Sequence, residues 1–282
     1  MICAWEAFLS LLPPALRRGT DLCGKGTLQE LRLRLGMPPE LRLENSVRYL
    51  SGTVTSEDLH FCINAACRYS PWNAETAAGG FLTGPGGHRI GICGEAVHKD
   101  GRMTGFRAVT SLCLRVARDF PGIAEKAAGF SGSLLILGAP GKGKTTLLRD
   151  LIRQISGKQG KTVAVIDERQ ELFPCFQGKQ VFSRGPHTDI LTGCSKQEGI
   201  PLALKCLGPD CIATDEITEV KDCRALTECG WCGVSLLATV HASGKEDLLS
   251  RKVYRPLVET GLFQDLLILQ TDKTWKYERM TL

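Results

Sequence analysis

The chain has 282 residues, of which 43% are hydrophobic and 23% are charged, and its formal net charge is +5. This composition is ordinary for a globular protein and argues against extensive disorder. No stretch approaches the roughly 18 apolar residues that a membrane-spanning helix needs. Lys and Arg do not gather in one half of the chain, which disfavours a polycationic nucleic-acid binder and leaves a local basic pore open.

The first part of the chain predicts an α+β domain. From Leu28, leucines alternate with Arg32 and Arg34, a pattern typical of a strand with one buried face. Capping residues open a predicted helix that runs from Thr55 to about Tyr69. Further strands are predicted at 40–43, within the glycine-rich segment 79–94, and at 111–117. The linker-like stretch 118–133 leads us to divide the chain into domains of residues 1–125 and 126–282.

The second part has a different rhythm, in which short apolar runs alternate with helical segments. An amphipathic helix is predicted at 144–156, with an edge hairpin near the C-terminus. Apolar strands alternating with helices indicate a parallel sheet covered on both faces, and hence an α/β fold. The predicted strands are 133–137, 162–166, 211–214 and 234–240, and the hairpin covers 266–269 and 273–278.

Cysteine usage bears on the compartment and on metal binding. The thirteen cysteines are scattered, and several lie inside apolar segments, where a free cysteine behaves as a small hydrophobe. Residues 1–14 lack a basic leader and carry Glu6, so we expect no signal peptide and a reduced, cytosolic protein. Cys229 and Cys232 have redox or zinc spacing, but no second C-x-x-C accompanies them, which favours a structural role.

The most specific motif is a phosphate-binding loop. Residues 138–145 fit G-x-x-x-x-G-K-[ST] at every fixed position, between an apolar strand and an amphipathic helix. Glycines let the backbone wrap a phosphate, and the amides at the helix start point toward it. We expect Lys144 to bridge the β- and γ-phosphates of ATP and Thr145 to ligate Mg²⁺. The expected binding segment is Gly138, Ala139, Pro140, Gly141, Lys142, Gly143, Lys144, Thr145 and Thr146.

Two acidic pairs and a histidine follow apolar strands and are candidate partners of this loop. Asp215 is expected to hold Mg²⁺ through water, and Glu216 to orient and deprotonate the attacking water. In the earlier pair, Asp167-Glu168, the second carboxylate is a candidate for the metal shell or the γ-phosphate; a capping or solvated role stays open for both pairs. His241 lies where a γ-phosphate sensor is expected, and a structural role is as good an interpretation.

The order of these motifs is similar to that of the secretion-type RecA-like ATPases of type II and type IV systems. Thr239-Val240-His241 matches their Thr-x-His box, whereas Asp215 stands where they usually carry glycine. A longer set of segments resembles the stage III sporulation protein AA family over roughly residues 28–280. These segments are LQELRLRLGMPPEL, FLTGPGGHRIGICGE, VIDERQEL, TDILTGCSKQEG and DEITEVKD.

The resemblance implies a RecA-like P-loop ATPase domain with a smaller N-terminal α+β domain. It further implies a cytosolic ATPase of the sporulation mother cell, assembled as a homohexameric ring on the cytoplasmic face of a membrane-embedded channel to the forespore, with no nucleic acid bound. Secretion-type ATPases place arginines of the first domain over the nucleotide, and CLRVA around Arg115 resembles that segment; Arg102 and Arg107 are alternatives. For Arg169 we expect a structural ion pair or a local contact.

Two other functions remain as alternatives. A nucleic-acid translocase with the same core needs basic or aromatic loops facing a pore, but aromatic residues are only 6% of the chain and basic residues do not cluster. A nucleotide-switched module such as a GTPase needs an N-K-x-D guanine-binding motif, and none follows the P-loop.

Overall fold

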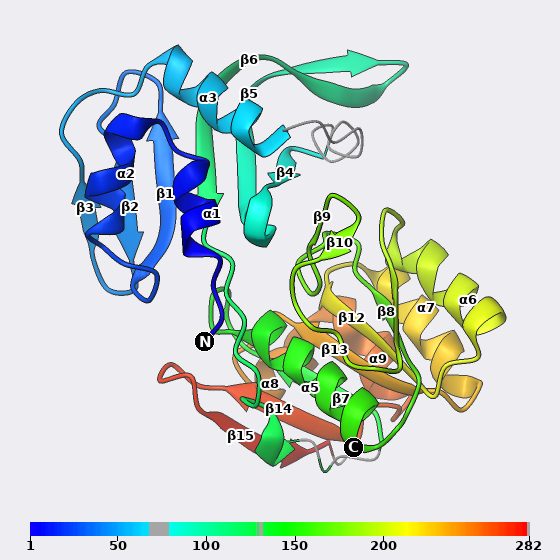
Figure 1. Cartoon of the computed structure of the whole chain (residues 1–282). Helices are drawn as coiled ribbons and strands as arrows, with labels where there is room; N and C mark the ends of the chain where they lie inside the picture. Colours follow the sequence, from blue (N-terminus) through cyan, green and yellow to red (C-terminus); the bar gives the residue numbers. More distant parts are fainter. Residues whose placement is uncertain (68–78, 128, 130–131, 281–282) are drawn as a thin grey trace. The chain divides into compact units, whose positions relative to one another are not determined.

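The computed structural model describes residues 1–67, 79–127, 129 and 132–280, and Figure 1 shows the course of the chain. The chain divides into two compact units. Unit 1 comprises Met1–Asp119 and Pro174–Val181, and unit 2 comprises Phe120–Phe173 and Phe182–Leu282. No helix in the described ranges is long and apolar enough to cross a lipid bilayer.

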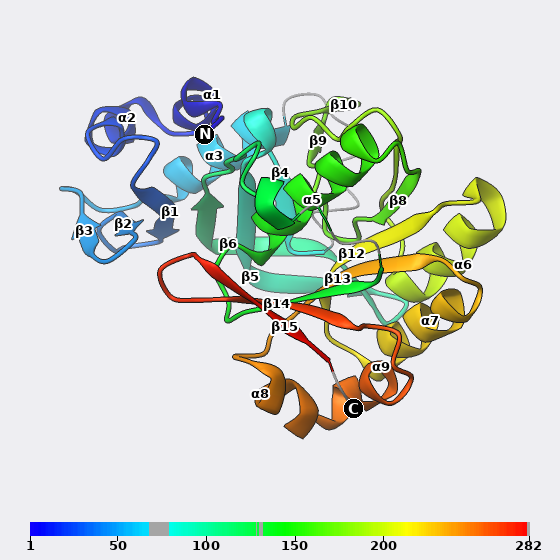
Figure 2. The same ribbon diagram turned by 90° about the horizontal axis from the view of Figure 1, so that it is seen from below.

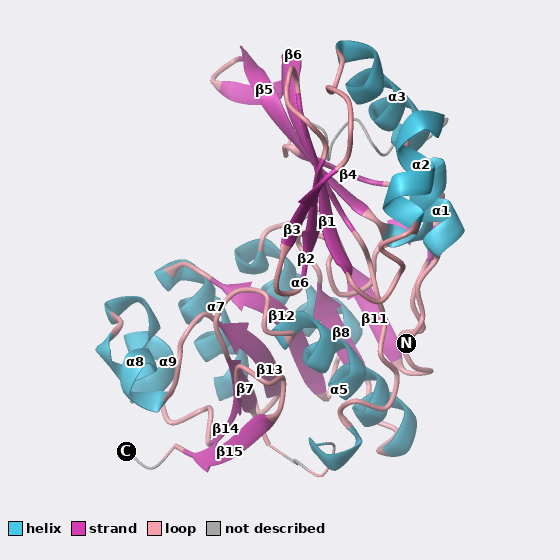
Figure 3. Ribbon diagram, turned by 90° about the vertical axis from the view of Figure 1, so that its left-hand side faces the viewer, coloured by secondary structure: helices cyan, strands magenta, loops and turns pink. Residues whose placement is uncertain are grey.

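Unit 1 is built on an antiparallel sheet whose strand order, within the described residues, is β3-β2-β1-β6-β5-β4. Helices α1, α2 and α3 all lie on one face of this sheet, as Figure 3 shows. The strands are β1 Leu28–Arg34, β2 Glu40–Leu43, β3 Val47–Tyr49, β4 Phe81–Thr83, β5 Arg89–Lys99 and β6 Arg102–Arg115. The helices are α1 Trp5–Ser10, α2 Pro14–Asp21 and α3 Ser56–Cys67, with a 3-10 turn, η1, at Pro85–Gly87. The expected end of α3 at Tyr69 lies outside the described residues.

The alternation at the start of β1 orients its side chains. Leu31 and Leu33 are fully buried beneath the helices, while Arg32 and Arg34 lie on the opposite face. That face is polar: Arg32 pairs with Glu30 on its own strand, at 2.9 Å. The predicted half-buried strand is therefore present, and its period-2 pattern separates an apolar face from an ionic one.

The hairpin formed by β5 and β6 is much longer than the expected strand at 111–117. Its outer part is exposed, and its register shifts after Cys93, Glu95 and Val97. At the first of these bulges, a Cβ on Gly94 would lie 1.9 Å from the carbonyl oxygen of Ala108, so only glycine fits there. A strand that buries neither face has no hydrophobic period, which is why the pattern predicts only the inner end.

His88 joins three segments of unit 1. Its Nε2 is 2.9 Å from the carbonyl oxygen of Ala4, its Nδ1 accepts the amide of Ala117 at 3.0 Å, and its ring meets Phe8 edge to face. Because Nδ1 accepts, the proton is on Nε2 and the ring is neutral. Burial lowers the pKa of His88 to about 4; the hydrogen bond to Ala4 opposes this shift and the charge of Arg118 adds to it.

This lowered pKa makes unit 1 sensitive to acid. The unfolded chain takes up a proton near pH 6.5, whereas the folded unit does so only near pH 4, so stability falls as the pH drops through this range. Between pH 7.5 and pH 5 we expect the wild type to lose about 2 kcal/mol more unfolding free energy than His88→Gln. Urea unfolding of both proteins at the two pH values measures this difference. Equal losses would show that His88 does not set the acid sensitivity.

Unit 2 contains a sheet of order β11-β8-β12-β13-β7-β14-β15 in the part of the chain described, parallel except for the last strand. Helix α5 covers one face, and α6, α7 and α9 cover the other (Figure 2). The strands are β7 Leu134–Leu137, β8 Val163–Ile166, β11 Thr188–Leu191, β12 Cys211–Ile217, β13 Ser235–Val240, β14 Asp265–Leu269 and β15 Trp275–Arg279. The helices are α5 Lys144–Lys158, α6 Lys196–Leu207, α7 Val220–Trp231, α8 Lys245–Ser250 and α9 Arg255–Glu259, with 3-10 turns η2 at Glu125–Ala127 and η3 at Lys252–Tyr254.

The boundary between the units differs from the expected division at 125/126. The chain enters unit 2 at Phe120, because the amides of Gly122 and Ala124 donate to the buried Asp150 of α5. In addition, a short hairpin of β9 Cys175–Phe176 and β10 Lys179–Gln180 belongs to unit 1. The sequence pattern does not show that the chain goes back to unit 1 here, because contacts between segments distant in sequence decide this.

Candidate nucleotide-binding site

The candidate site lies where four neighbouring strands of unit 2 end. Strands β8, β12, β13 and β7 are adjacent and parallel, so their carboxyl ends meet at one edge of the sheet. The P-loop follows β7, the two acidic pairs follow β8 and lie at the end of β12, and His241 follows β13. This edge is the usual ligand-binding position in open α/β sheets.

The P-loop has a backbone that fits a phosphate. Gly141 and Gly143 have φ angles of 75° and 95°, and Gly143 caps the N-terminus of α5. A Cβ on Gly138 would meet Leu269 at 3.1 Å. The whole predicted segment, including Ala139, Pro140, Lys142 and Thr146, forms this turn and the first residues of α5. Backbone amides at the start of a 15-residue helix suit an anionic ligand.

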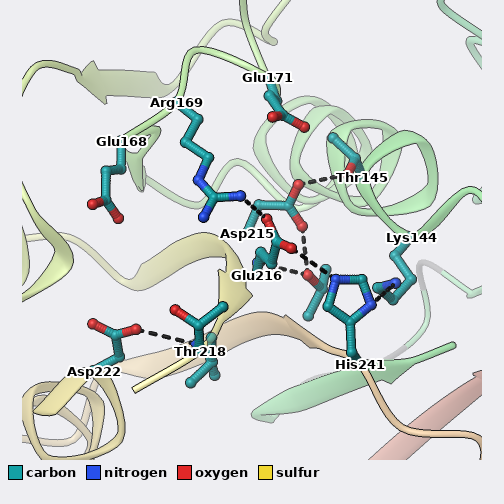
Figure 4. Close-up of polar contacts among 12 residues, drawn as sticks. Lys144, Thr145, Glu168, Arg169, Glu171, Asp215, Glu216, Thr218, Asp222 and His241 are labelled. Atoms are coloured by element: carbon teal, nitrogen blue, oxygen red, sulfur yellow. Dashed lines mark hydrogen bonds and ion pairs between the residues drawn. The ribbon is translucent and has the colours of Figure 1, made fainter. Parts of the chain in front are cut away.

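Lys144 is buried at the centre of the site. Its Nζ donates to the carbonyl oxygens of Gly138 and Ala139 at 2.8 and 3.1 Å, and lies 2.9 Å from Nδ1 of His241. Burial lowers the pKa of Lys144, while the charges of Asp215 and Glu216 oppose that shift. The lysine therefore links the P-loop backbone to the histidine, and Figure 4 shows its contact with His241.

Two hydroxyls hold the carboxylate of Asp215. Thr145 Oγ1 donates to Oδ2 at 2.5 Å, and Thr239 Oγ1 donates to Oδ1. The same Thr239 hydroxyl accepts the amide of Glu216 at 2.8 Å. A hydroxyl at the start of the P-loop helix beside a carboxylate is the donor set that Mg²⁺ prefers.

Glu216 contacts two other side chains of the site, one through each carboxylate oxygen (Figure 4). Its Oε1 lies 2.7 Å from His241 Nε2, and its Oε2 pairs with Arg169. Burial by itself would raise the pKa of Glu216, but the hydrogen bond from His241 and the charge of Arg169 bring it below its ordinary value. Glu216 also has a φ angle of 55°, a left-handed conformation that is uncommon for non-glycine residues.

The acidic pair after β8 divides its tasks. Asp167 is buried and accepts the amides of residues 171–173, so it shapes the following loop. Burial raises the pKa of Asp167 to about 6, against those hydrogen bonds. Glu168 pairs with the buried Lys196 at 2.6 Å, and in Figure 4 it points away from Asp215 and Glu216. In this arrangement Arg169, and not Glu168, meets the catalytic candidate.

The sequence predicts only part of this set of contacts. The ion pair expected of Arg169 reaches a residue 47 positions away, Glu216. The sequence indicates Thr239 only through the Thr-x-His box, and it gives no indication of Lys196. The usable signal was positional: Thr239, like His241, lies at the carboxyl end of a parallel strand.

The candidate arginines of the first domain lie in unit 1. Arg115 is at the end of β6, half exposed, with Nε 3.4 Å from Glu30. Arg107 pairs with Glu95 on the exposed hairpin, and the side chain of Arg102 lies outside the described residues. The role of Arg115 in catalysis therefore remains a proposal.

The C-x-x-C pair ends α7. Cys229 is 2% exposed in the last turn, and Cys232 caps the helix with an exposed thiol. Within the described residues no cluster of three or more metal-ligating side chains occurs, and the cysteines are free thiols.

Comparison with known proteins identifies the family. The sequence profile described as sporulation stage III, protein AA matches residues 9–277. The chain belongs to the stage III sporulation protein AA family. Stage III sporulation protein AA of Bacillus subtilis strain 168 is 34% identical over 256 residues, which cover 87% of this chain and 83% of that relative.

Solved structures establish the fold of this family member. The pilus retraction motor PilT with bound ADP superimposes with a TM-score of 0.59 at 14% identity, covering 98% of this chain and 82% of that one. The ATPase DotB of Legionella pneumophila gives a TM-score of 0.57 at 16% identity, covering 90% and 77%. The chain therefore has the fold of the RecA-like secretion ATPases, which combines an N-terminal domain and a P-loop domain.

Proposed function

We propose that this sporulation protein is an ATPase that hydrolyses ATP to ADP and phosphate. The observation that carries the proposal is the continuous chain of contacts from Lys144 through His241 to Glu216, next to the Thr145–Asp215 pair. It joins a phosphate-binding cation, a hydrogen-bonding relay and a candidate base at one helix N-terminus. The likeness to two structures titled as an ATPase and a pilus retraction motor supports the same conclusion.

The proposed roles follow from the contacts. The amides of residues 138–146 bind the phosphates, and Lys144 exchanges its carbonyl and His241 contacts for β- and γ-phosphate oxygens. Thr145 and, through water, Asp215 would hold Mg²⁺, which supplies neutralising charge on the β and γ oxygens. Glu216 orients the attacking water and accepts its proton. His241 is the γ-phosphate sensor, and its Nε2 contact links it to Glu216. Glu168 then serves as a structural partner of Lys196 beside the site.

We also propose the assembly that the family resemblance implies. The protein would form a homohexameric ring in the mother cell and work on the cytoplasmic face of an integral membrane channel, where it powers transport or assembly. It would be peripheral to the membrane, through contact with that partner. The mass of the particle with and without ATP tests the ring: six times the chain mass is expected, and a monomer under both conditions would contradict it.

The alternative is a nucleic-acid translocase with the same core. Phosphate release from ATP, measured with and without double-stranded DNA, separates the two functions. We expect DNA to leave the rate unchanged, and a severalfold stimulation by DNA would favour the translocase. Competition by GTP tests whether the protein is a nucleotide-switched module, since a GTPase would bind GTP in preference to ATP.

Arg115 is proposed as a finger that completes the site of a neighbouring subunit. An arginine finger contributes roughly 10³–10⁵ in rate in well-studied systems, so Arg115→Ala should lose most turnover. Mixing Arg115→Ala with Lys144→Ala should restore part of it, because one chain supplies an intact P-loop and the other an intact arginine. If no mixing ratio restores turnover although subunits exchange, the finger does not act between subunits.

A further inference from the structure

The loop that carries Arg169 is firmly attached to the P-loop helix. Asp167 fastens it from within through the amides of residues 171–173. Arg149, which lies on α5 and is 5% exposed, donates to the carbonyl oxygens of Glu171 and Leu172, and its guanidinium stacks 4.6 Å from the ring centre of Phe182. These contacts therefore hold the start of this loop in a fixed position relative to α5.

Two neighbouring side chains of this loop, those of Glu168 and Arg169, have different partners. Glu168 pairs with Lys196. Arg169 pairs with Oε2 of Glu216, as Figure 4 shows. The arginine side chain is 48% exposed and that of Glu216 is 27% exposed, so the ion pair is partly accessible to solvent. Such a half-exposed ion pair contributes little to stability, which leaves orientation as its main effect.

Glu216 needs external support for its orientation. Its backbone is in the left-handed region, a strained conformation for a non-glycine residue that persists only where neighbours fix it. Thr239 holds its amide, and His241 holds Oε1. His241, however, also contacts Lys144, so its position depends on a lysine that the proposed reaction draws toward the phosphates. Arg169 is anchored on a separate loop, so its hold on Oε2 does not depend on that lysine.

We propose that Arg169 is a positioning residue, which keeps the Glu216 carboxylate directed at the attacking water and affects turnover only through Glu216. The proposal rests on the proposed ATPase function. Its rival is a direct contact between Arg169 and the γ-phosphate, in which case the arginine would act whether or not residue 216 is a carboxylate. The two differ in measurable ways.

The experiment is a double-mutant cycle on the full chain, with Arg169→Ala and Glu216→Gln alone and together. Turnover is measured by release of labelled phosphate over hours, and ATP and ADP affinities by equilibrium binding. We expect Arg169→Ala to lower kcat about 10- to 100-fold with KM changed less than about twofold, Arg169→Lys to recover part of the loss, and the double variant to match Glu216→Gln. Arg224→Ala, an exposed arginine of α7, is the matched control and should retain wild-type turnover.

The ATP and ADP affinities distinguish a positioning role from a direct γ-phosphate contact even where turnover is too slow to measure. A positioning role leaves the ratio of ATP to ADP affinity unchanged by Arg169→Ala in both backgrounds. A selective loss of ATP affinity, a further fall in turnover beyond that of Glu216→Gln, or wild-type kcat in Arg169→Ala would each overturn the proposal. Absence of ATP hydrolysis by the wild type would instead overturn the ATPase function on which it rests.

Discussion

Replacing Lys144 by alanine is expected to lower nucleotide turnover strongly in a protein that still folds. The ammonium group is buried against two P-loop carbonyls and lies within hydrogen-bond distance of His241. Losing one partner of a buried, hydrogen-bonded charge pair typically costs about 2–5 kcal/mol, so turnover should fall roughly 30-fold or more. Phosphate release and ATP affinity measure the effect.

The control for this variant is Lys205→Ala, which removes an exposed lysine from α6. It should retain wild-type turnover and the same circular dichroism spectrum. Normal turnover by Lys144→Ala would mean that the loop, despite its geometry, does not serve a triphosphate.

Glu216→Gln is expected to separate binding from chemistry. Glutamine preserves the shape and accepts a hydrogen bond from His241, but it cannot take a proton from water. Loss of a general base usually costs about 10²–10⁴ in rate, so kcat should fall by at least about 100-fold while ATP affinity is retained. Glu228→Gln, on the exposed side of α7, provides the matched control.

The acidic pair after β8 offers a second check on this assignment. Glu168→Gln should leave most turnover intact, because the carboxylate faces Lys196. If Glu168→Gln abolishes turnover and Glu216→Gln does not, then the roles of the two acidic pairs are reversed.

Local signals explain what the sequence predicts well. The run from β7 through the P-loop to α5 combines an apolar strand, glycines with positive φ and an amphipathic helix, all within 25 residues of the chain. The ends of β12 and β13 are predicted for the same reason, since buried parallel strands read as continuous apolar runs. Because such strands end at one edge, the candidate residues were expected there together.

Features set by distant contacts were not predictable in this way. Strand β11 is a half-buried edge strand with a mixed sequence, TDIL, and lacks the continuous apolar run of its neighbour β8. The hairpin at Pro174–Val181 belongs to unit 1 although its neighbours in sequence belong to unit 2. The ion pair of Arg169 with Glu216 joins two strand ends, and only the fold determines which residue of the first acidic segment reaches the second.

The proposed ATPase function places hydrolysis at the site formed by Lys144, Glu216 and His241. The most direct measurement is phosphate release by the full chain with ATP, in the presence of Mg²⁺ and after its removal by EDTA. We expect steady release that requires Mg²⁺ and that falls roughly 30-fold or more in Lys144→Ala. Release at the same rate by wild type and Lys144→Ala, or none by the wild type with Mg²⁺ at any protein concentration, would contradict it.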